Sequence, residues 1–469
     1  MRWCVAAVLS ALATIRVGSA AAQGDEDLDL IPSEVLEDST DGQAVEELAQ
    51  PPLSSRLFLE DAFSLWSPST SVPVAYPAEL VSWQNRLSLD VNLRWKPWKT
   101  LVINFSDRLS AFAEQGNPIL SSDTFRNALR EGYVAWQPPA DHTYFEAGRV
   151  NIRKGVGLGF NPTDFFKTRT LVGQASLDPS VLRQNRLGTL LLRWQAIWSG
   201  GSASIAFAPK VADSPDLSNG EPGRFDPRFD ATNDAFRLLC SIGFDVWDLN
   251  PEILAYFELG RSKLGLNLSR PVGDAVIAYA EWAGGPQSHL ITRAIEYGQE
   301  TGTLPPVAPI DPPNLSRKFR SDLVTGFSWT VATAVTLNIE YHYHQAGFSR
   351  ANWRSWFDVG GAPEASPFLA AELWYLRAYA SDQQEPISRH QLFLRAAWPR
   401  AFVTDLELTG FAFVSLLDGS VLSQVSASYY LSSVWTASAY ASANLGDDRS
   451  ERGSFPQRLN SILQLTRYF

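Results

Sequence analysis

The chain has 469 residues, of which 45% are hydrophobic, 19% charged and 12% aromatic. This composition is too apolar for a disordered chain and has too few charges for a typical cytosolic enzyme. The formal charge of -11 excludes nucleic acid as an expected partner, because binding to a phosphate backbone requires clustered positive charge. The length allows about two to four ordinary domains, or one large β-barrel.

The N-terminal residues have the pattern of a secretory signal peptide. A basic residue precedes an apolar run from Cys4 to Ile15, and small residues follow up to Ala22. We therefore expect residues 1–22 to be removed during export. A transmembrane anchor is the weaker alternative, because Arg16 interrupts an apolar run that is already short for a membrane-spanning helix.

The next segment, residues 23–52, is strongly acidic. Between Gln23 and Gln50 there are ten acidic residues and no Lys or Arg. Such a composition predicts a disordered arm, which holds most of the negative charge of the exported chain. Two roles are open for this arm, namely a solvated spacer and a docking segment for another protein.

The remainder of the chain, residues 53–469, is dominated by alternation of polar and apolar residues. In the segment 82–95, apolar residues such as Leu87, Leu89, Val91 and Leu93 alternate with polar ones. The segment 335–344 alternates in the same way along its whole length. A period of two residues is typical of a β-strand whose two faces meet different surroundings.

Sixteen further segments resemble these two, although several alternate less cleanly: 53–66, 99–113, 127–137, 142–150, 188–198, 201–209, 235–246, 251–260, 262–270, 274–283, 318–331, 388–399, 402–415, 420–431, 434–445 and 457–469. The links between them sort into short ones on one side and mostly long ones on the other, as in transmembrane barrels. We therefore predict an all-β fold, a transmembrane antiparallel up-and-down β-barrel of about 18 strands, with 16 as the alternative count. The segment 365–380 differs and predicts a short amphipathic helix in a long loop.

The last predicted strand provides a resemblance to a known class. Leu459, Ser461, Leu463, Leu465, Arg467 and Phe469 share one face, and Phe469 is the last residue of the chain. This resembles the C-terminal strand of Gram-negative outer-membrane β-barrels. The resemblance implies an outer-membrane location and recognition of Leu463, Leu465 and Phe469 by the barrel assembly machinery. Arg467 departs from the pattern, which usually has an aromatic or apolar residue there.

A second resemblance is local. Gly148 and Arg149, followed by the glycine-rich segment 155–160 and by Asn161, Pro162 and Asp164, look like a region of large porin-like and alginate-export-like barrels. It implies a large barrel without identifying a solute. The glycine spacing also imitates a phosphate-binding loop, but the turn formed by Asn161 and Pro162 favours a close-packed backbone turn instead.

The segment 149–187 is the most basic part of the chain. Its bases, which outnumber the acids Asp164 and Asp178, are Arg149, Arg153, Lys154, Lys167, Arg169, Arg183 and Arg186. If this loop folds into the barrel, these residues are candidates for a channel constriction that favours anions. The alternative is a lid on the barrel mouth whose charges are solvated or bind lipopolysaccharide phosphate.

Other chemistry has weaker support. Glu340, His342 and His344 share one strand face, which fits a metal site but also fits a polar barrel interior. No G-x-S-x-G motif surrounds any serine. We therefore expect no cofactor, no bound metal and no enzymatic activity.

The sequence thus predicts a porin-like channel for passive passage of small hydrophilic solutes, anionic ones among them. Two alternatives are open: a gated barrel of a polysaccharide export system, and a plugged structural or adhesive barrel. The ratio of 32 Arg to 7 Lys is compatible with rows of guanidinium groups. The expected partners are outer-membrane lipid, lipopolysaccharide, the barrel assembly machinery and a periplasmic partner of the acidic arm.

Overall fold

The structure is a computed structural model, which describes residues 52–69, 71–115, 125–139, 142–214, 225–246, 248–259, 261–306, 316–331 and 334–469. The expected signal peptide, residues 1–22, lies outside these ranges. The expected acidic arm, residues 23–52, lies outside them as well except for its last residue. Both therefore stay predictions.

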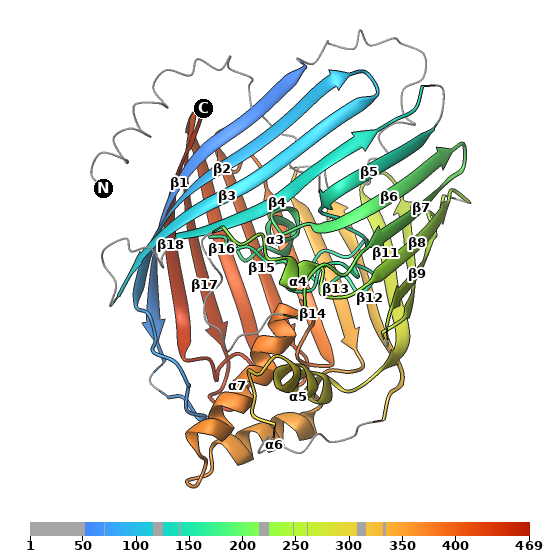
Figure 1. Ribbon diagram of the computed structural model, residues 1–469. Helices are drawn as coiled ribbons and strands as arrows, with labels where there is room; N and C mark the ends of the chain where they lie inside the picture. Colours follow the sequence, from blue (N-terminus) through green and yellow to red (C-terminus); the bar gives the residue numbers. More distant parts are fainter. Residues whose placement is uncertain are drawn as a thin grey trace.

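The described chain forms one closed barrel of eighteen antiparallel strands (Figure 1). Each strand pairs with its neighbours in sequence, and β1 pairs with β18 to close the ring, for example through Phe58 and Tyr468. The strands are β1 Leu53–Pro68, β2 Trp83–Trp98, β3 Leu101–Glu114, β4 Phe125–Trp136, β5 Thr143–Val150, β6 Thr189–Trp198, β7 Gly201–Ala208, β8 Arg237–Phe244, β9 Glu252–Glu258, β10 Lys263–Val272, β11 Val276–Gln287, β12 Lys318–Thr330, β13 Thr336–His344, β14 His390–Trp398, β15 Leu406–Ser415, β16 Val421–Ser432, β17 Trp435–Leu445 and β18 Gln457–Tyr468.

The predicted fold class and the count of eighteen strands are confirmed, and the alternative count of sixteen is wrong. Every predicted segment coincides with one strand, with ends that differ by a few residues. The short links lie at the barrel end where β1 begins and β18 ends. Figure 1 shows the C-terminus at the end opposite to the helices of the long loops.

The alternation of the sequence corresponds to the two faces of the wall. In β13, Asn338, Glu340, His342 and His344 are buried, while Ile339 between them is exposed. The exposed outer face of other strands carries large apolar side chains such as Phe63, Leu65, Leu192 and Val425. An apolar outer face around a polar interior is the arrangement that a bilayer requires of a barrel.

Strand β18 carries Leu463 and Leu465 of the predicted assembly signal. In β18, the side chains of Leu463 and Leu465 are exposed on the outer face. The backbone N–H of Phe469 donates to the carbonyl of Leu57 over 3.0 Å, which ties the end of the chain to β1. Arg467 lies over the rings of Trp435 and Phe469, at 5.5 and 4.7 Å from their centroids. This cation–π contact accommodates the base that departs from the family pattern.

The long loops contain five helices in the described residues: α3 Pro179–Gln184, α4 Phe229–Thr232, α5 Leu290–Glu300, α6 Arg350–Gly360 and α7 Pro367–Asp382. The helix predicted at 365–380 is α7. Helices α5, α6 and α7 pack around a buried apolar cluster that includes Trp353, Trp356 and Leu373, and we call these three helices the cap. None of the described helices has the length and apolar character needed to cross a bilayer.

The cap contains the long-loop aromatic residues Trp353, Trp356 and Phe357, on which the hypothesis of a plugged or adhesive barrel rests. Ser349 begins α6 through a reciprocal capping box with Asn352, which places Trp353 and Trp356 on the inner side of the helix. Arg377 of α7 lies 4.7 Å from the ring centroid of Trp374 and 4.1 Å from that of Phe455. The cap is therefore fixed to the loop that precedes β18.

The outer face provides a first test. Val425 lies within β16, opposite Gly410 and Ala441 on the neighbouring strands, and its side chain is exposed. Replacing Val425 by Arg places a charge against lipid, and we expect it to lower the free energy of unfolding in vesicles by about 2–4 kcal/mol. Urea titration followed by tryptophan fluorescence measures this change. Val425→Ala is the control, and equal effects of both variants would contradict a lipid-facing wall.

Candidate functional site: the inserted loop and the barrel interior

The loop between β5 and β6, residues 151–188, crosses the interior of the barrel (Figure 1). We call it the inserted loop. Its residues hydrogen-bond or pair with strands on several sides of the ring, namely β4, β9, β10, β11, β13, β14 and β16. A loop that reaches so much of the wall narrows the interior at its own level.

Two buried carboxylates of the wall hold the first part of this loop. Glu281 of β11 accepts from the backbone N–H groups of Gly157 at 3.0 Å and Thr163 at 2.7 Å, and from the Thr163 hydroxyl at 2.8 Å. The side chain of Glu281 is fully buried. Because irregular backbone inside a protein leaves N–H groups without partners, these acceptors remove a large desolvation cost.

Glu340 of β13 has the same role for the neighbouring residues. It accepts from the backbone N–H groups of Leu158 at 2.5 Å and Gly159 at 2.9 Å, and from the Tyr279 hydroxyl at 2.8 Å. A fourth hydrogen bond of 2.7 Å joins its Oε2 to Nε2 of His342. The sequence marked Glu340 as a polar inward residue, but its two partners in the inserted loop lie about 180 positions away in the chain.

The glycines of this segment lie directly against the wall. A Cβ at Gly159 would come within 2.6 Å of the Phe393 ring, and Gly155 has a φ of +95°, which side chains rarely adopt. The predicted close-packed turn is confirmed. The described residues show the glycine segment ending in a turn, with α3 following only much later in the loop.

An ion pair and hydrogen bonds to the wall hold the second half of the loop. Asp178 caps α3 and forms an ion pair of 2.8 Å with Arg395 of β14. Gln424 of β16 accepts from the backbone N–H of Leu177 at 2.9 Å, and Arg130 of β4 donates to Asn185 at 2.9 Å. The loop is therefore anchored at both ends of its path across the interior.

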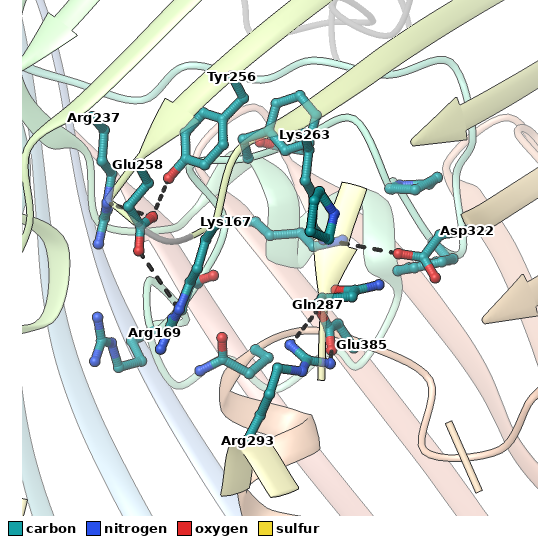
Figure 2. A pocket seen from close by; sticks show the side chains of 18 residues that line it. Lys167, Arg169, Arg237, Tyr256, Glu258, Lys263, Gln287, Arg293, Asp322 and Glu385 are labelled. Atoms are coloured by element: carbon teal, nitrogen blue, oxygen red, sulfur yellow. Dashed lines mark hydrogen bonds and ion pairs between the residues drawn. The ribbon is translucent and has the colours of Figure 1, made fainter. Parts of the chain in front are cut away.

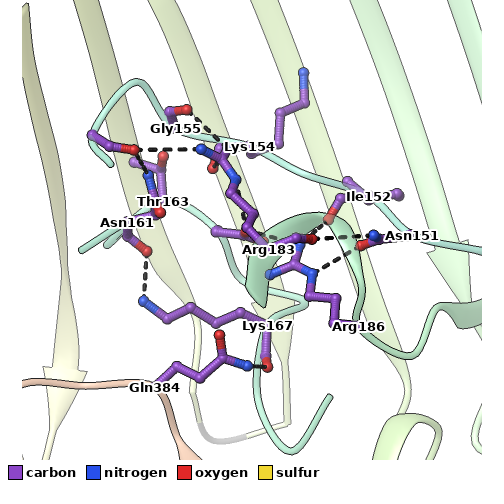
Figure 3. A network of polar contacts seen from close by, with 12 residues as sticks. Asn151, Ile152, Lys154, Gly155, Asn161, Thr163, Lys167, Arg183, Arg186 and Gln384 are labelled. Carbon is purple, nitrogen blue, oxygen red and sulfur yellow. Dashed lines mark hydrogen bonds and ion pairs between the residues drawn. The ribbon is translucent and has the colours of Figure 1, made fainter. Parts of the chain in front are cut away.

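Three of the seven predicted constriction bases, Lys167, Arg183 and Arg186, support the loop itself (Figure 3). Arg183 donates to the carbonyls of Lys154 at 2.7 Å and Gly155 at 3.0 Å. Arg186 donates to Asn151 at 2.8 Å and forms an ion pair of 2.8 Å with Asp164. These guanidinium groups are bound within the loop.

Lys167 and the remaining bases are distributed over different surroundings. Lys167 donates to the Asn161 carbonyl at 2.6 Å, and Arg169 pairs with Asp234 at 2.5 Å. Lys154 pairs with Glu252 of β9, and Arg149 lies over Phe229. Of the seven, Arg153 is the one with an exposed side chain. The structure therefore brings Lys154, Lys167, Arg183 and Arg186 into one region, while Arg149 donates to the carbonyls of Gly188 and Pro227.

Burial and nearby acids shift the pKa of three of these bases. Burial lowers the pKa of Lys167 to about 8, against the opposing effect of Asp164 and other acids. Burial also lowers the pKa of Arg183, which Asp164 partly offsets. For Arg169, burial acts to lower the pKa, but Asp234 and Tyr297 outweigh it and raise the pKa.

Three arginines form a row on the inner wall, and the sequence analysis did not identify them individually. Arg86, Arg108 and Arg130 lie on β2, β3 and β4, and all three are buried on the inner face. Arg108 pairs with Asp90 at 2.8 Å and with Glu60, and Arg130 also pairs with Asp90. The high Arg to Lys ratio was the available signal, although it does not locate the row.

The two histidines of β13 bind different carboxylates. His342 is bonded to Glu340, whereas Nδ1 of His344 is 2.8 Å from Oδ1 of Asp322. Among the residues that the structure describes, there is no group of three or more His, Cys, Asp or Glu arranged to hold a metal ion. The shared strand face is thus used for hydrogen bonds within the wall.

Comparison with known proteins identifies the fold. OccK5 of Pseudomonas aeruginosa superposes with a TM-score of 0.51 at 9% identity, over 89% of this chain and 98% of that one. OccK11 of the same organism gives a TM-score of 0.50 at 9% identity, over 89% and 96%. The chain has the fold of a large porin. No family model and no curated protein matches the sequence.

The anchoring of the inserted loop provides a second test. Replacing Glu340 by Gln removes one charged acceptor oxygen and directs an amide N–H₂ at existing donors. We expect hydrogen exchange at residues 157–160 to become about tenfold faster, because a charge-assisted hydrogen bond contributes about 1.5 kcal/mol or more. Exchange mass spectrometry of the refolded protein measures this rate.

The matched control is Glu296→Gln, which removes the same charge from an exposed position on α5. It is expected to leave the exchange of residues 157–160 unchanged. Equal exchange in the Glu340→Gln variant and the unsubstituted protein would show that Glu340 does not hold the loop.

Proposed function

We propose that the protein is an outer-membrane channel for passive passage of small hydrophilic solutes, narrowed by the inserted loop. The observation that carries this proposal is a polar inner wall, crossed by a loop, inside a barrel whose outer face is apolar. Hydrophilic solutes cross such an interior because its side chains replace part of their hydration. No reaction and no cofactor form part of the proposal.

A preference for anions is the finer part of this proposal. The Arg86 side chain has Nε and Nη2 atoms without a hydrogen-bond partner in the described part of the chain. It lies beside Gly173 of the inserted loop, where its Nη1 is 3.8 Å from the position of a Cβ on that glycine. Arg108 and Arg130, by contrast, share two carboxylates. Of these three wall arginines, Arg86 is therefore the one whose charge is least engaged by carboxylates, and we assign it the attraction of a passing anion.

The seven bases of the inserted loop have a smaller part in this selectivity. Their positive charges contribute to the potential inside the barrel, but hydrogen bonds and ion pairs fix most of the groups that carry them. Arg153 is exposed, and it is the loop base that we assign, together with Arg86, to the path of the solute.

Location and partners belong to the same proposal. The outward Leu463 and Leu465 and the terminal Phe469 support recognition of β18 by the barrel assembly machinery. The apolar outer face supports contact with outer-membrane lipid and lipopolysaccharide. We propose that the acidic arm is the segment that binds a periplasmic partner.

A plugged barrel is the second candidate. It is favoured by the number of strands that the inserted loop contacts and by the cap over the long-loop end. An alginate-export-like conduit is the related possibility in which the barrel opens only with a periplasmic machine. Deletion of residues 23–50 distinguishes the diffusion channel from the export conduit. A diffusion channel should still conduct without the arm, whereas an export barrel should lose secretion and keep its fold.

The test of the channel is single-channel current of the refolded protein in a planar bilayer under a KCl gradient. We expect stepwise currents with a reversal potential that favours chloride. Replacing Arg86 by Gln removes one unpaired positive charge from the narrow region and should lower the chloride-to-potassium permeability ratio by a factor on the order of two.

Arg449→Gln is the matched control, since Arg449 forms an exposed ion pair with Asp358 outside the barrel wall. It should leave the reversal potential unchanged. A cation preference of the unsubstituted protein would keep the channel and contradict the anion preference. Folded protein without any current would favour the plugged barrel.

A further inference from the structure

A separate pocket lies at the long-loop end of the barrel, between the inserted loop, the strands β8 to β12 and the cap (Figure 2). Its cavity has a volume of about 80 Å³. The loop contributes Lys167 and Arg169, the wall contributes Lys263 and Gln287, and α5 contributes Arg293. Three parts of the molecule that are distant in sequence therefore meet around one small space.

Positive charge predominates in the lining. Its cations are Lys167, Arg169, Arg237, Arg261, Lys263 and Arg293, and its acids are Asp164, Glu258, Asp322 and Glu385. Six cations against four acids leave two positive charges around the cavity. An anion of one or two charges would therefore neutralise the lining.

The four acids are already bound to protein donors. Glu385 holds Arg293 through both oxygens, at 3.3 and 2.6 Å. Asp322 is bonded to His344, and Asp164 is paired with Arg186. Glu258 accepts from the Tyr256 hydroxyl. Their acceptor oxygens are thus engaged by protein donors, of which Arg293 also lines the cavity.

Several donors around the cavity are less well satisfied. The Lys263 ammonium is 3.9 Å from Asp322, beyond hydrogen-bond distance. The Lys167 ammonium is buried and donates to one carbonyl, although it carries three N–H groups. Gln287 is 6% exposed, and its Nε2 has no hydrogen-bond partner among the described residues.

We propose that this pocket binds a phosphate group, with Lys263, Lys167 and Gln287 as its donors. Ammonium and amide groups approach an anion from separate directions, which suits a tetrahedral oxyanion with several acceptor oxygens. The planar fork of Arg binds carboxylate and phosphate alike, but two of the pocket arginines, Arg169 and Arg293, are already engaged by Asp234 and Glu385. The group belongs to inorganic phosphate or to a small phosphomonoester whose remaining atoms extend toward the mouth.

A phosphate in this pocket would contact the parts of the molecule that control access to the interior. The backbone N–H of Arg169 donates to the Asp382 carbonyl at the end of α7 over 2.7 Å, and its side chain bonds to Tyr297 of α5. Gln384 also donates to Thr170 at 3.1 Å. The bound anion would therefore strengthen the junction between the inserted loop and the cap.

Isothermal titration calorimetry on the folded full chain in detergent tests the pocket with three probes: inorganic phosphate, glycerol 3-phosphate and acetate. We expect at least one phosphate probe to bind and acetate to bind more weakly. Lys263→Gln should weaken the binding of that probe about tenfold, since it removes one charged donor. Because binding is measured without current, its result is independent of whether the barrel conducts.

Lys210→Gln is the control, because Lys210 forms a solvent-exposed ion pair with Asp213 and does not line the pocket. Gln287→Ala is a second, uncharged variant and should weaken phosphate in the same direction. Binding of inorganic phosphate that Lys263→Gln reduces supports the free ion, and binding of glycerol 3-phosphate alone supports the phosphomonoester. Binding of neither, equal binding of acetate, or equal loss in Lys210→Gln would overturn the proposal.

Discussion

The arrangement inside the barrel depends on hydrogen bonds from the backbone of the inserted loop to two buried carboxylates, Glu281 and Glu340. A loop without regular secondary structure has N–H groups that water would otherwise satisfy, and burying them unpaired costs about 1–3 kcal/mol each. Each carboxylate accepts from two backbone N–H groups of the loop. The donors in turn compensate the charges of the two carboxylates, which would be costly to bury alone. The path of the loop across the interior follows from these contacts.

The same rule explains the distribution of positive charge. Bases near the loop donate to buried acids and carbonyls that would otherwise have no partner. Arg186 pairs in this way with Asp164, and Arg395 pairs with Asp178. Removing one partner of such a pair leaves an uncompensated buried charge, which is strongly destabilising. Among the described residues, unused donors occur at many places, and two of these places are Arg86 beside the loop and Gln287, near Lys263, at the mouth. We propose that the protein interacts with a solute at these two places.

Local pattern was sufficient to predict the barrel, because each strand shows its two environments in its own sequence. The alternation in 335–344 assigned Glu340 and His342 to the inner face, and α7 was recognised from its spacing of apolar residues. Helices α5 and α6 were missed although their apolar residues recur at helical spacing on one face, so the signal was present in the sequence. The ion-pair partners of residues in the loop could not be predicted either, because a pair such as Asp178 and Arg395 is separated by 217 positions in the sequence. The basic character of 149–187 was therefore visible, but not which bases were bound.

The central claim is that the inserted loop narrows an otherwise passable polar interior. Replacing residues 171–186 by a short Gly-Ser linker removes α3 and the contacts to Arg130, Arg395 and Gln424, while β5 and β6 stay in place. Single-channel conductance of this variant, after its barrel has been verified by heat-dependent migration, is the most direct measurement. The account predicts a conductance several-fold above that of the unsubstituted protein. Equal conductance of the two proteins would show that the loop does not limit passage and would contradict the account.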